Sequence, residues 1–385
     1  MPKKILPNEP DPQRRTRSEF IESAKKISRY CRLWKLSSDD HAIALGLMGE
    51  RHRAEQLLWS DLRARYHASK GLASIMTSHQ TNAPTGRTYY MLSFCDDSGY
   101  TSDRVPYLSI QQTIEKVRRA IASLDLHAFV MLEVHPVINY PRGGAGRSLL
   151  LGAHAIAWTD RPFNHNQSSA ALCASPAWSG TLGADPVHIS VIAPGDIARV
   201  AHYLMKQRLS AKNLMPNKHK LGKLLMMETI KGYRNEFAVR LFEGQSQVEL
   251  MNMMFGVGDG SEVRQTLRAE VTKWHRARTC PISVPSELDV WAFWQRLRQD
   301  HGSKHYLPYR FDGGSARPVP TIVPPVPAIN ASAPALTITG EPMPVENHTA
   351  RKPANSFNRA RHTRRGLLSR VKHVNNAQPE SSWTD

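Results

Sequence analysis

Apolar residues in the first part of the chain recur at intervals of three and four, a spacing that predicts amphipathic helices. One such stripe comprises Phe20, Ile21, Ala24, Ile27 and Cys31. The acidic pair Asp39 and Asp40 suits the start of a second helix, and a third helix is predicted over residues 50–67. We therefore expect a disordered N-terminus over residues 1–17 and a basic helical segment over residues 18–80.

The pattern changes near residue 88, where short β-rich runs begin to alternate with amphipathic stretches. Strands are predicted at residues 88–94, 127–137, 148–159 and 187–192, and helices at residues 109–124 and 196–204. The second and third strands flank a glycine-rich turn, which predicts an antiparallel hairpin. This order, over residues 88–210, predicts an α+β fold with a central antiparallel or mixed sheet, helices on one face of it, and helical N- and C-terminal segments flanking it.

The remaining third of the chain divides into two parts by composition. Residues 211–312 show helical periodicity and many basic residues, which predicts a helical C-terminal segment. Residues 313–385 begin with a stretch rich in Pro, Ala, Thr and Val, which predicts a disordered linker. A basic tail follows and contains Arg361, Arg364 and Arg365. Such a tail can track phosphates, although an inert polar tail would have the same composition.

The charge of the chain indicates a polyanionic partner. The 51 Lys and Arg residues exceed the 33 Asp and Glu residues, which gives a formal charge of +18. Such an excess favours DNA, RNA or an anionic membrane surface, although a solvated basic surface without a specific partner is the alternative. No apolar run reaches the roughly 18 residues of a membrane helix, and the charged N-terminus is unlike a secretory signal. The four cysteines are widely spaced, which fits a reducing cytoplasm.

Three residues of the predicted hairpin suggest a metal site. Side chains alternate along a strand, so Glu133 and His135 share one face, and His154 lies on the neighbouring strand. Two imidazoles and a carboxylate suit a divalent cation such as Mg²⁺ or Mn²⁺. The alternative is a buried histidine that is simply hydrogen-bonded within the core.

A tyrosine and a lysine on the next predicted helix suggest a nucleophile. Tyr203 and Lys206 are three residues apart, so they lie on the same helical face. A nearby cation stabilises a phenolate, and a metal can polarise a phosphate opposite it. The alternative is a half-buried tyrosine whose ring is covered by the lysine stem.

The order of these motifs resembles that of the HUH endonuclease family, which includes rolling-circle replication initiators, relaxases and related transposases. Residues 90–94 resemble the first strand motif, residues 132–135 the strand with an acidic or histidine ligand, and residues 203–206 the helix with nucleophile and lysine. Residues 152–154 stand where the family has two histidines around one bulky residue. The resemblance covers residues 88–208.

Two departures from the family pattern refine the resemblance. Gly152 replaces the first histidine of the named pair, so either Glu133 or His135 supplies the missing ligand, with His165 as a weaker substitute, or the metal site is degenerate. Gln207 stands where a second tyrosine would follow Tyr203 by one helical turn. The match is therefore to the single-tyrosine branch. His202 receives no catalytic role and is expected to be structural or to face phosphate.

The resemblance implies an enzyme that nicks a single-stranded or hairpin DNA origin of a plasmid or phage. Tyr203 would attack a phosphate polarised by Mg²⁺ or Mn²⁺, giving a 5′-phosphotyrosyl link and a free 3′-hydroxyl that can prime DNA replication, while Lys206 orients the phosphate or the phenolate. The metal ligands would be His154, His135 and Glu133, and the DNA-binding residues Arg199, Arg208, Arg361, Arg364 and Arg365. No GxxxxGK[ST] loop occurs, so unwinding would need a host helicase.

Two other functions remain compatible with the sequence. A catalytically degenerate relative on the same scaffold would bind DNA without needing metal or Tyr203. A helical nucleic-acid-binding regulatory protein would use the sheet only to pack its helices. The second alternative would be favoured if His154 and Tyr203 lay more than roughly 10 Å apart, too far to act on one phosphate.

Overall fold

The computed structural model describes residues 12–33, 37–49, 57–138, 147–180, 185–206, 211–216, 224–228, 235–278, 287–300 and 307–312. All of these residues belong to one compact unit, which spans residues 1–322. Four of the arginines predicted to bind DNA, namely Arg208, Arg361, Arg364 and Arg365, lie outside the described residues. None of the described helices has the length and apolar character needed to cross a membrane.

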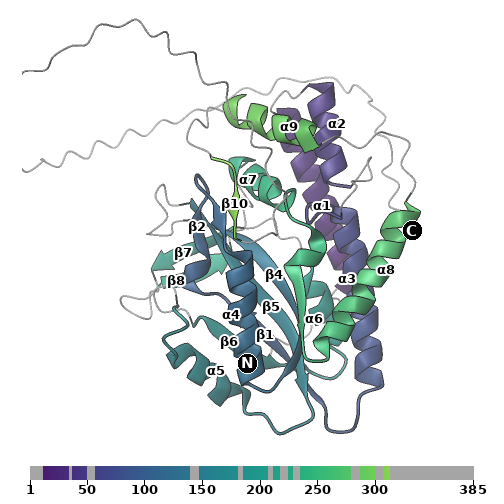
Figure 1. Ribbon diagram of the computed structural model, residues 1–385, viewed down its shortest axis with the longest axis vertical. Helices are drawn as coiled ribbons and strands as arrows, with labels where there is room; N and C mark the ends of the chain where they lie inside the picture. The colour runs from purple at the N-terminus through teal and green to yellow at the C-terminus, as the bar shows by residue number, and fades with distance from the viewer. Residues whose placement is uncertain are drawn as a thin grey trace, which may run out of the picture. The chain divides into compact units, whose positions relative to one another are not determined.

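The core of this unit is a mostly antiparallel sheet in which six strands follow the order β6-β1-β5-β4-β7-β8 (Figure 1). These strands are β1 Thr88–Phe94, β4 His127–Ile138, β5 Arg147–Thr159, β6 Val187–Val191, β7 Lys212–Pro216 and β8 Leu224–Glu228. Two further strands join beside this path: β2 (Tyr100–Ser102) pairs with β5, and β9 (Met254–Val257) pairs with β4. The contact of β4 with β7 is parallel. The prediction of an α+β protein with a largely antiparallel sheet is confirmed.

Nine helices are described around the sheet. They are α1 Pro12–Leu33, α2 Ser38–Leu47, α3 Leu62–Thr81, α4 Ile110–Ser123, α5 His165–Ala174, α6 Ile197–Leu204, α7 Asn235–Gln245, α8 Gly260–Ala277 and α9 Glu287–Asp300. Short 3-10 turns at Asp97–Gly99 and Leu250–Met253 and a two-stranded ribbon of β3 (Tyr107–Leu108) and β10 (Arg310–Phe311) complete the described elements.

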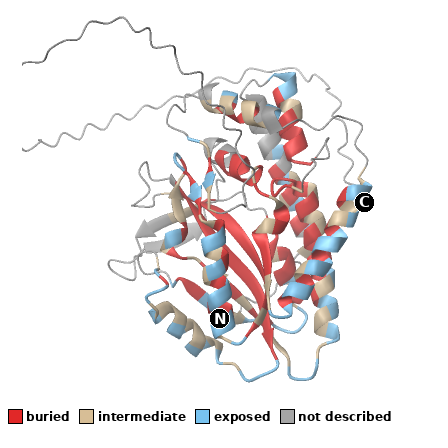
Figure 2. Cartoon of the chain, viewed as in Figure 1, coloured by how far each residue is buried: buried red, intermediate tan, exposed pale blue. Residues whose placement is uncertain are grey.

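The helices cover both faces of the sheet, so the prediction that they lie on one face was wrong (Figure 1). Helix α4 packs on the face that carries Phe255, whereas α6 packs on the face that carries His154. Phe255 pairs with Val130 and His154 pairs with Met131. Because Val130 and Met131 are consecutive in β4, their side chains point to opposite faces. Strand β4 is accordingly buried on both sides, as its nearly unbroken apolar run requires (Figure 2).

The N-terminal helices begin and end at different residues from those predicted. Helix α1 begins at Pro12, before the boundary expected at residue 18. The helix predicted over residues 50–67 corresponds to α3, which begins only at Leu62, because the Asp61 carboxylate accepts a hydrogen bond from Ala64 N at 2.9 Å and caps the helix. Leu58, which the pattern assigned to that helix, forms an isolated β-bridge with Glu249.

Residues 211–312, predicted to be helical, contain the four strands β7, β8, β9 and β10 as well as α7, α8 and α9. Strand β9 is the clearest case, since its pairing with β4 extends the central sheet. The turn after β9 presses against the sheet so closely that a Cβ atom at Gly260 would lie 1.8 Å from the carbonyl oxygen of Ala128. The glycine-rich residues 256–260 thus form the turn from strand β9 into helix α8.

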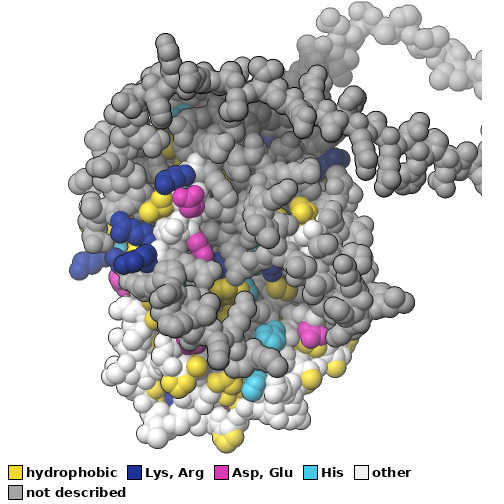
Figure 3. All heavy atoms as spheres, turned by 180° about the vertical axis from the view of Figure 1, so that it is seen from behind, with side chains coloured by type: hydrophobic (Ala, Val, Ile, Leu, Met, Phe, Trp, Pro, Cys, Tyr) yellow, Lys and Arg dark blue, Asp and Glu magenta, His cyan; other side chains and the backbone are white. Residues whose placement is uncertain are grey.

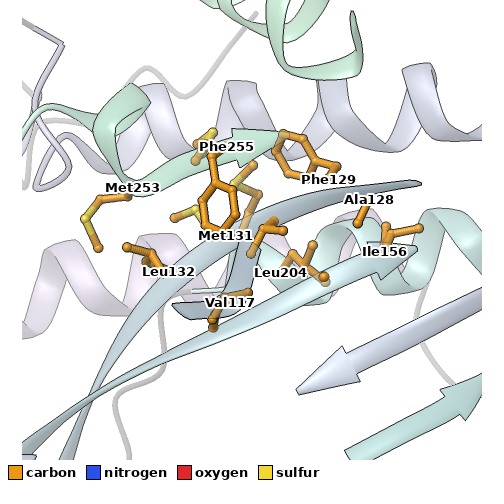
Figure 4. Packing of buried hydrophobic residues seen from close by; sticks show 14 of the residues in the cluster. Val117, Ala128, Phe129, Met131, Leu132, Ile156, Leu204, Met253 and Phe255 are labelled. Carbon is orange, nitrogen blue, oxygen red and sulfur yellow. The ribbon is translucent and has the colours of Figure 1, made fainter. Parts of the chain in front are cut away.

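One continuous hydrophobic core joins the layers (Figure 4). Val117 of α4, Leu132 of β4, Phe255 of β9 and Leu204 of α6 all belong to it. Full burial of such a side chain contributes roughly 1.5–3 kcal/mol, so the sheet and the helices on both faces stabilise one another. Described Lys and Arg side chains gather at one side of the face opposite to that of Figure 1 (Figure 3).

Candidate metal and tyrosine site

The strand register brings Glu133, His135 and His154 together on one face of the sheet. Glu133 pairs across the strands with Gly152. His135 lies two residues after Glu133 in β4, and His154 lies two residues after Gly152 in β5, so the three side chains share one face. Glu133 Oε2 is 3.0 Å from His135 Nε2 and 3.1 Å from His154 Nε2. All three side chains are buried, and one ligand atom from each lies within 4.8 Å of the others. This donor set could hold a metal ion.

The surroundings of Gly152 leave no room for a side chain at this position. A Cβ atom at this position would lie 2.8 Å from the carbonyl oxygen of Phe94 and 3.5 Å from Cys95 Sγ. The backbone of β1 therefore occupies the space that a side chain at position 152 would need. The carboxylate of Glu133, which projects from the opposite residue of β4, fills the position between the two histidines instead.

Two of the three donor atoms lack a hydrogen bond of good geometry within the described part of the chain. Glu133 Oε2 and His135 Nε2 are 3.0 Å apart, yet within the described residues neither atom makes a hydrogen bond of acceptable geometry. A buried polar atom without a hydrogen bond costs about 1–3 kcal/mol. A cation at the point where these atoms converge would remove that cost, so the residues present fit a metal ion.

The protonation states also suit a cation. Burial lowers the pKa of His135 from 6.5 to about 3 and also lowers the pKa of His154. Both imidazoles are thus neutral at pH 7, and each keeps a lone pair for a ligand bond. Burial alone would raise the pKa of Glu133, but its interactions with His135, with the ammonium of Lys206 and with His154 outweigh burial and hold that pKa well below its usual range. Glu133 is therefore anionic, as a metal ligand at this position would need to be.

Ser93 orients His154 toward Glu133. Ser93 lies directly opposite His154 in the β1–β5 register, and its Oγ is 2.9 Å from His154 Nδ1. With Nδ1 engaged, Nε2 is the ring nitrogen that faces the carboxylate. A hydrogen bond to the second nitrogen is a regular feature of histidine ligands because it fixes the tautomer and the ring orientation. The sequence placed Ser93 in the first strand motif without giving it this role.

Tyr203, in the last turn of α6, and Lys206, just beyond the end of that helix, reach the same cluster. The ring centroids of Tyr203 and His154 are 5.4 Å apart, well inside the limit of roughly 10 Å set above. Lys206 Nζ lies 3.3 Å from the centre of the Tyr203 ring and 3.3 Å from Glu133 Oε2. Lys206 is buried and Tyr203 is half-buried. One ammonium group thus links the tyrosine to the carboxylate of the metal-ligand set.

Helix α3 holds this end of α6 in place. The buried side chain of Arg65 donates hydrogen bonds to the carbonyl oxygens of Met205, at 3.3 Å, and Lys206, at 2.9 Å. These carbonyls end α6, where a cation is favourable. Ser69 Oγ is 2.7 Å from His202 Nδ1, so His202 is buried against α3 and serves a structural role. Arg65 and Ser69 were missed by sequence reasoning because nothing in the local pattern links them to residues so distant in sequence.

Two other predicted residues lie away from the cluster. His165 begins α5, and its ring is 6.1 Å from that of Tyr90, whose side chain points to the face opposite that of Ser93. The suggestion that His165 replaces a missing ligand was therefore wrong. Arg199 is exposed and pairs with Asp196 at 2.8 Å. Lys212 of β7, which the sequence did not single out, adds a positive charge that further lowers the pKa of His135.

Comparisons with protein-family models, curated proteins and solved structures give no match to this chain. What the site can do is therefore argued from its own residues.

Proposed function

We propose that this protein is a metal-dependent tyrosine endonuclease of the HUH type that nicks single-stranded or hairpin DNA. The observation that carries the proposal is the placement of Tyr203 and Lys206 against a buried carboxylate and two neutral imidazoles. A nucleophile, a cation and a metal-ligand set within contact distance of one another are what phosphodiester transfer requires. The formal charge of +18 suits a DNA substrate.

Glu133, His135 and His154 would hold the cation. A carboxylate with two imidazoles suits Mn²⁺ and related divalent ions, and Mg²⁺ is the more oxygen-demanding alternative. When bound, the ion would supply Lewis-acid polarisation of the scissile phosphate. Ser93 would keep the His154 ring in the ligand orientation through its hydrogen bond to Nδ1.

Tyr203 would be the nucleophile. Its phenol loses a proton, and the oxygen forms a bond to phosphorus while the bond from phosphorus to the 3′-oxygen breaks. The 3′-oxygen takes up a proton and leaves as a free hydroxyl, and the 5′-phosphate remains linked to the tyrosine. The ammonium of Lys206, which lies 3.3 Å from the centre of the Tyr203 ring, would stabilise the negative charge of the phenolate. Helix α3, through Arg65, would keep the nucleophile in position.

One contact favours a second function, that of a catalytically degenerate DNA-binding relative. Lys206 Nζ is 3.3 Å from Glu133 Oε2, so the ammonium already neutralises the carboxylate. In such a relative this ion pair would be purely structural, and DNA binding would need neither a divalent ion nor Tyr203. In both functions the protein would act in the cytoplasm, and any unwinding of the origin would depend on a host helicase.

The test is a cleavage assay on labelled single-stranded DNA with and without Mn²⁺. Wild type is compared with Tyr203→Phe and with the matched control Tyr66→Phe, which removes the hydroxyl of a tyrosine packed on Phe20 instead. A covalent protein–DNA adduct is expected only with metal and only when Tyr203 is present, and His154→Ala should lose it as well. DNA binding that needs no metal, forms no adduct and is unchanged in Tyr203→Phe would refute the nuclease proposal and support the catalytically degenerate relative.

A further inference from the structure

Exposed apolar side chains gather at one place on the described surface. Four large apolar residues in the described part of the chain are clearly exposed: Val105 at 48%, Tyr107 at 44%, Val191 at 51% and Leu307 at 51%. Three of these, all except Val191, belong to the β3–β10 ribbon or the residues beside it. Scattered exposed apolar residues are ordinary, whereas a contiguous group with polar neighbours marks a binding surface.

Backbone hydrogen bonds fix the ribbon. Tyr107 pairs with Arg310 in a parallel register. Leu307 N donates to the carbonyl oxygen of Arg104 at 2.8 Å, and Arg310 N donates to that of Pro106 at 2.9 Å. Tyr107 N donates to Thr101 Oγ1 at 2.9 Å. The exposed side chains therefore project from a defined backbone, although the two segments are about 200 residues apart in sequence.

The opposite side of the ribbon is packed into the molecule. Leu108 and Tyr309 are buried, and the Tyr309 hydroxyl donates to the carbonyl oxygen of Arg240 at 2.6 Å. The Asp312 carboxylate accepts hydrogen bonds from the backbone of Gln111, at 2.9 Å, and Gln112, at 2.8 Å, at the start of α4. The ribbon is therefore packed into the molecule by its buried side chains. The exposed side chains are not needed for that packing and are available to bind a partner.

The outward side chains combine one aromatic ring with two cations. Arg104 and Arg310, which flank Tyr107, are both exposed. Aromatic rings that stack on bases, set among arginines that contact the backbone, are the means by which proteins hold single-stranded nucleic acid. Duplex bases are already stacked on one another and offer no free face. The arginines favour a polyanion over an uncharged protein surface as the partner.

We infer that the outward surface formed by Arg104, Val105, Tyr107, Leu307 and Arg310 is a stacking platform for unpaired bases of single-stranded DNA. The inference rests on the proposed function, because it assigns a place to the strand that flanks the cleaved phosphate. The chain leaves β1 just after Ser93 and runs through β2, which pairs with β5 at Leu150, before it reaches β3. The platform therefore extends from the end of the sheet that carries the metal-ligand set.

The experiment measures binding of a labelled oligothymidine to the full chain by fluorescence anisotropy, in EDTA and in a Tyr203→Phe background. Loss of one base–aromatic stack, worth about 1–3 kcal/mol, predicts a Kd about 5- to 150-fold weaker for Tyr107→Ala. Tyr107→Phe keeps the ring and should stay within about twofold. Arg310→Ala should weaken binding and reduce the salt dependence by about one ion. Val191→Ala, which removes an exposed apolar side chain elsewhere, should change nothing.

Three outcomes would overturn the platform: an unchanged oligothymidine Kd in Tyr107→Ala, an equal loss on a matched duplex, or a change only in self-association, which would make the ribbon a protein contact. The adduct assay separates this inference from the proposed function. Ring-dependent binding by a wild type that forms no adduct would keep the platform and refute the nuclease. Normal adduct formation and normal binding by Tyr107→Ala would do the reverse.

Discussion

Gly152 offers the sharpest test of the site's geometry, through the substitution Gly152→Ala. The added Cβ would lie 2.8 Å from the Phe94 carbonyl oxygen, closer than real Cβ atoms come to another heavy atom. That oxygen belongs to the backbone of β1, so relief requires the β1–β5 pair to shift. Overpacking of this kind costs about 1–3 kcal/mol. At roughly 2–4 °C per kcal/mol for a domain of 150–250 residues, Tm should fall by several degrees.

Gly71→Ala is the matched control, because a Cβ there would lie 2.9 Å from Glu270 Oε2. The distance is almost the same, but that oxygen is the tip of a partly exposed side chain that can rotate away. Replacing glycine by alanine inside α3 should then be neutral or stabilise the fold by up to about 1 kcal/mol. Thermal melts of both variants decide the matter. Equal stability of Gly152→Ala and wild type, or equal shifts in the two variants, would refute the reasoning.

Three further predictions concern the charges and hydrogen bonds of the site. Lys206→Met removes an ammonium 3.3 Å from Glu133 Oε2, and since unit charges 4 Å apart interact by about 4 kcal/mol near a protein surface, we expect Mn²⁺ to bind at least about tenfold more tightly by calorimetry; unchanged affinity would mean that Glu133 is not a ligand. The pKa of His135 is about 3 in the folded metal-free chain and 6.5 when unfolded. Between these values the unfolded chain binds a proton at His135 and the folded chain does not. The contribution of His135 to the free energy of unfolding is thus fully present above pH 6.5 and falls by about 1.4 kcal/mol per pH unit below it. In urea unfolding between pH 6.5 and 4.5, the free energy of unfolding should therefore fall less steeply in His135→Gln than in wild type. Arg65→Lys replaces a forked donor by a single one beneath α6, which should lower stability in urea by about 1–3 kcal/mol and reduce the adduct yield, whereas loss of stability at full yield would assign Arg65 to folding alone.

The convergence of Glu133, His135 and His154 was predictable because it follows from local rules. Alternation along a strand places Glu133 and His135 on one face, and a hairpin brings the next strand alongside. The spacing of Tyr203 and Lys206 predicted that the two side chains lie together, and they do, but not on one helical face, because α6 ends at Leu204 and Lys206 lies just beyond it. The strand period of two residues and the helix period of about 3.6 residues were enough to predict which residues meet, once the order of the strands and helices was known.

The parts that sequence reasoning missed depend on contacts between distant segments. In the sequence, Arg65 is one more basic residue on a predicted helix, and only the packing of α3 on α6 shows that it binds the carbonyl groups at the end of the helix that carries Tyr203. Strand β9 is too short to stand out from its helical neighbours, and its pairing with β4 defines it. The role of Gly152 likewise depends on how closely β1 approaches β5, which no local pattern reveals.

The packing of α3 has a practical consequence for dissecting the protein. Residues 88–210 carry every motif of the resemblance, yet the helix that supports Tyr203 precedes this segment, and β9 and α8 follow it. A fragment cut to the motif boundaries would expose apolar surface on the face that holds the metal-ligand set. The smallest fragment able to fold by itself must therefore extend from α3 to α8. In fragments truncated at the motif boundaries, a loss of function would reflect misfolding.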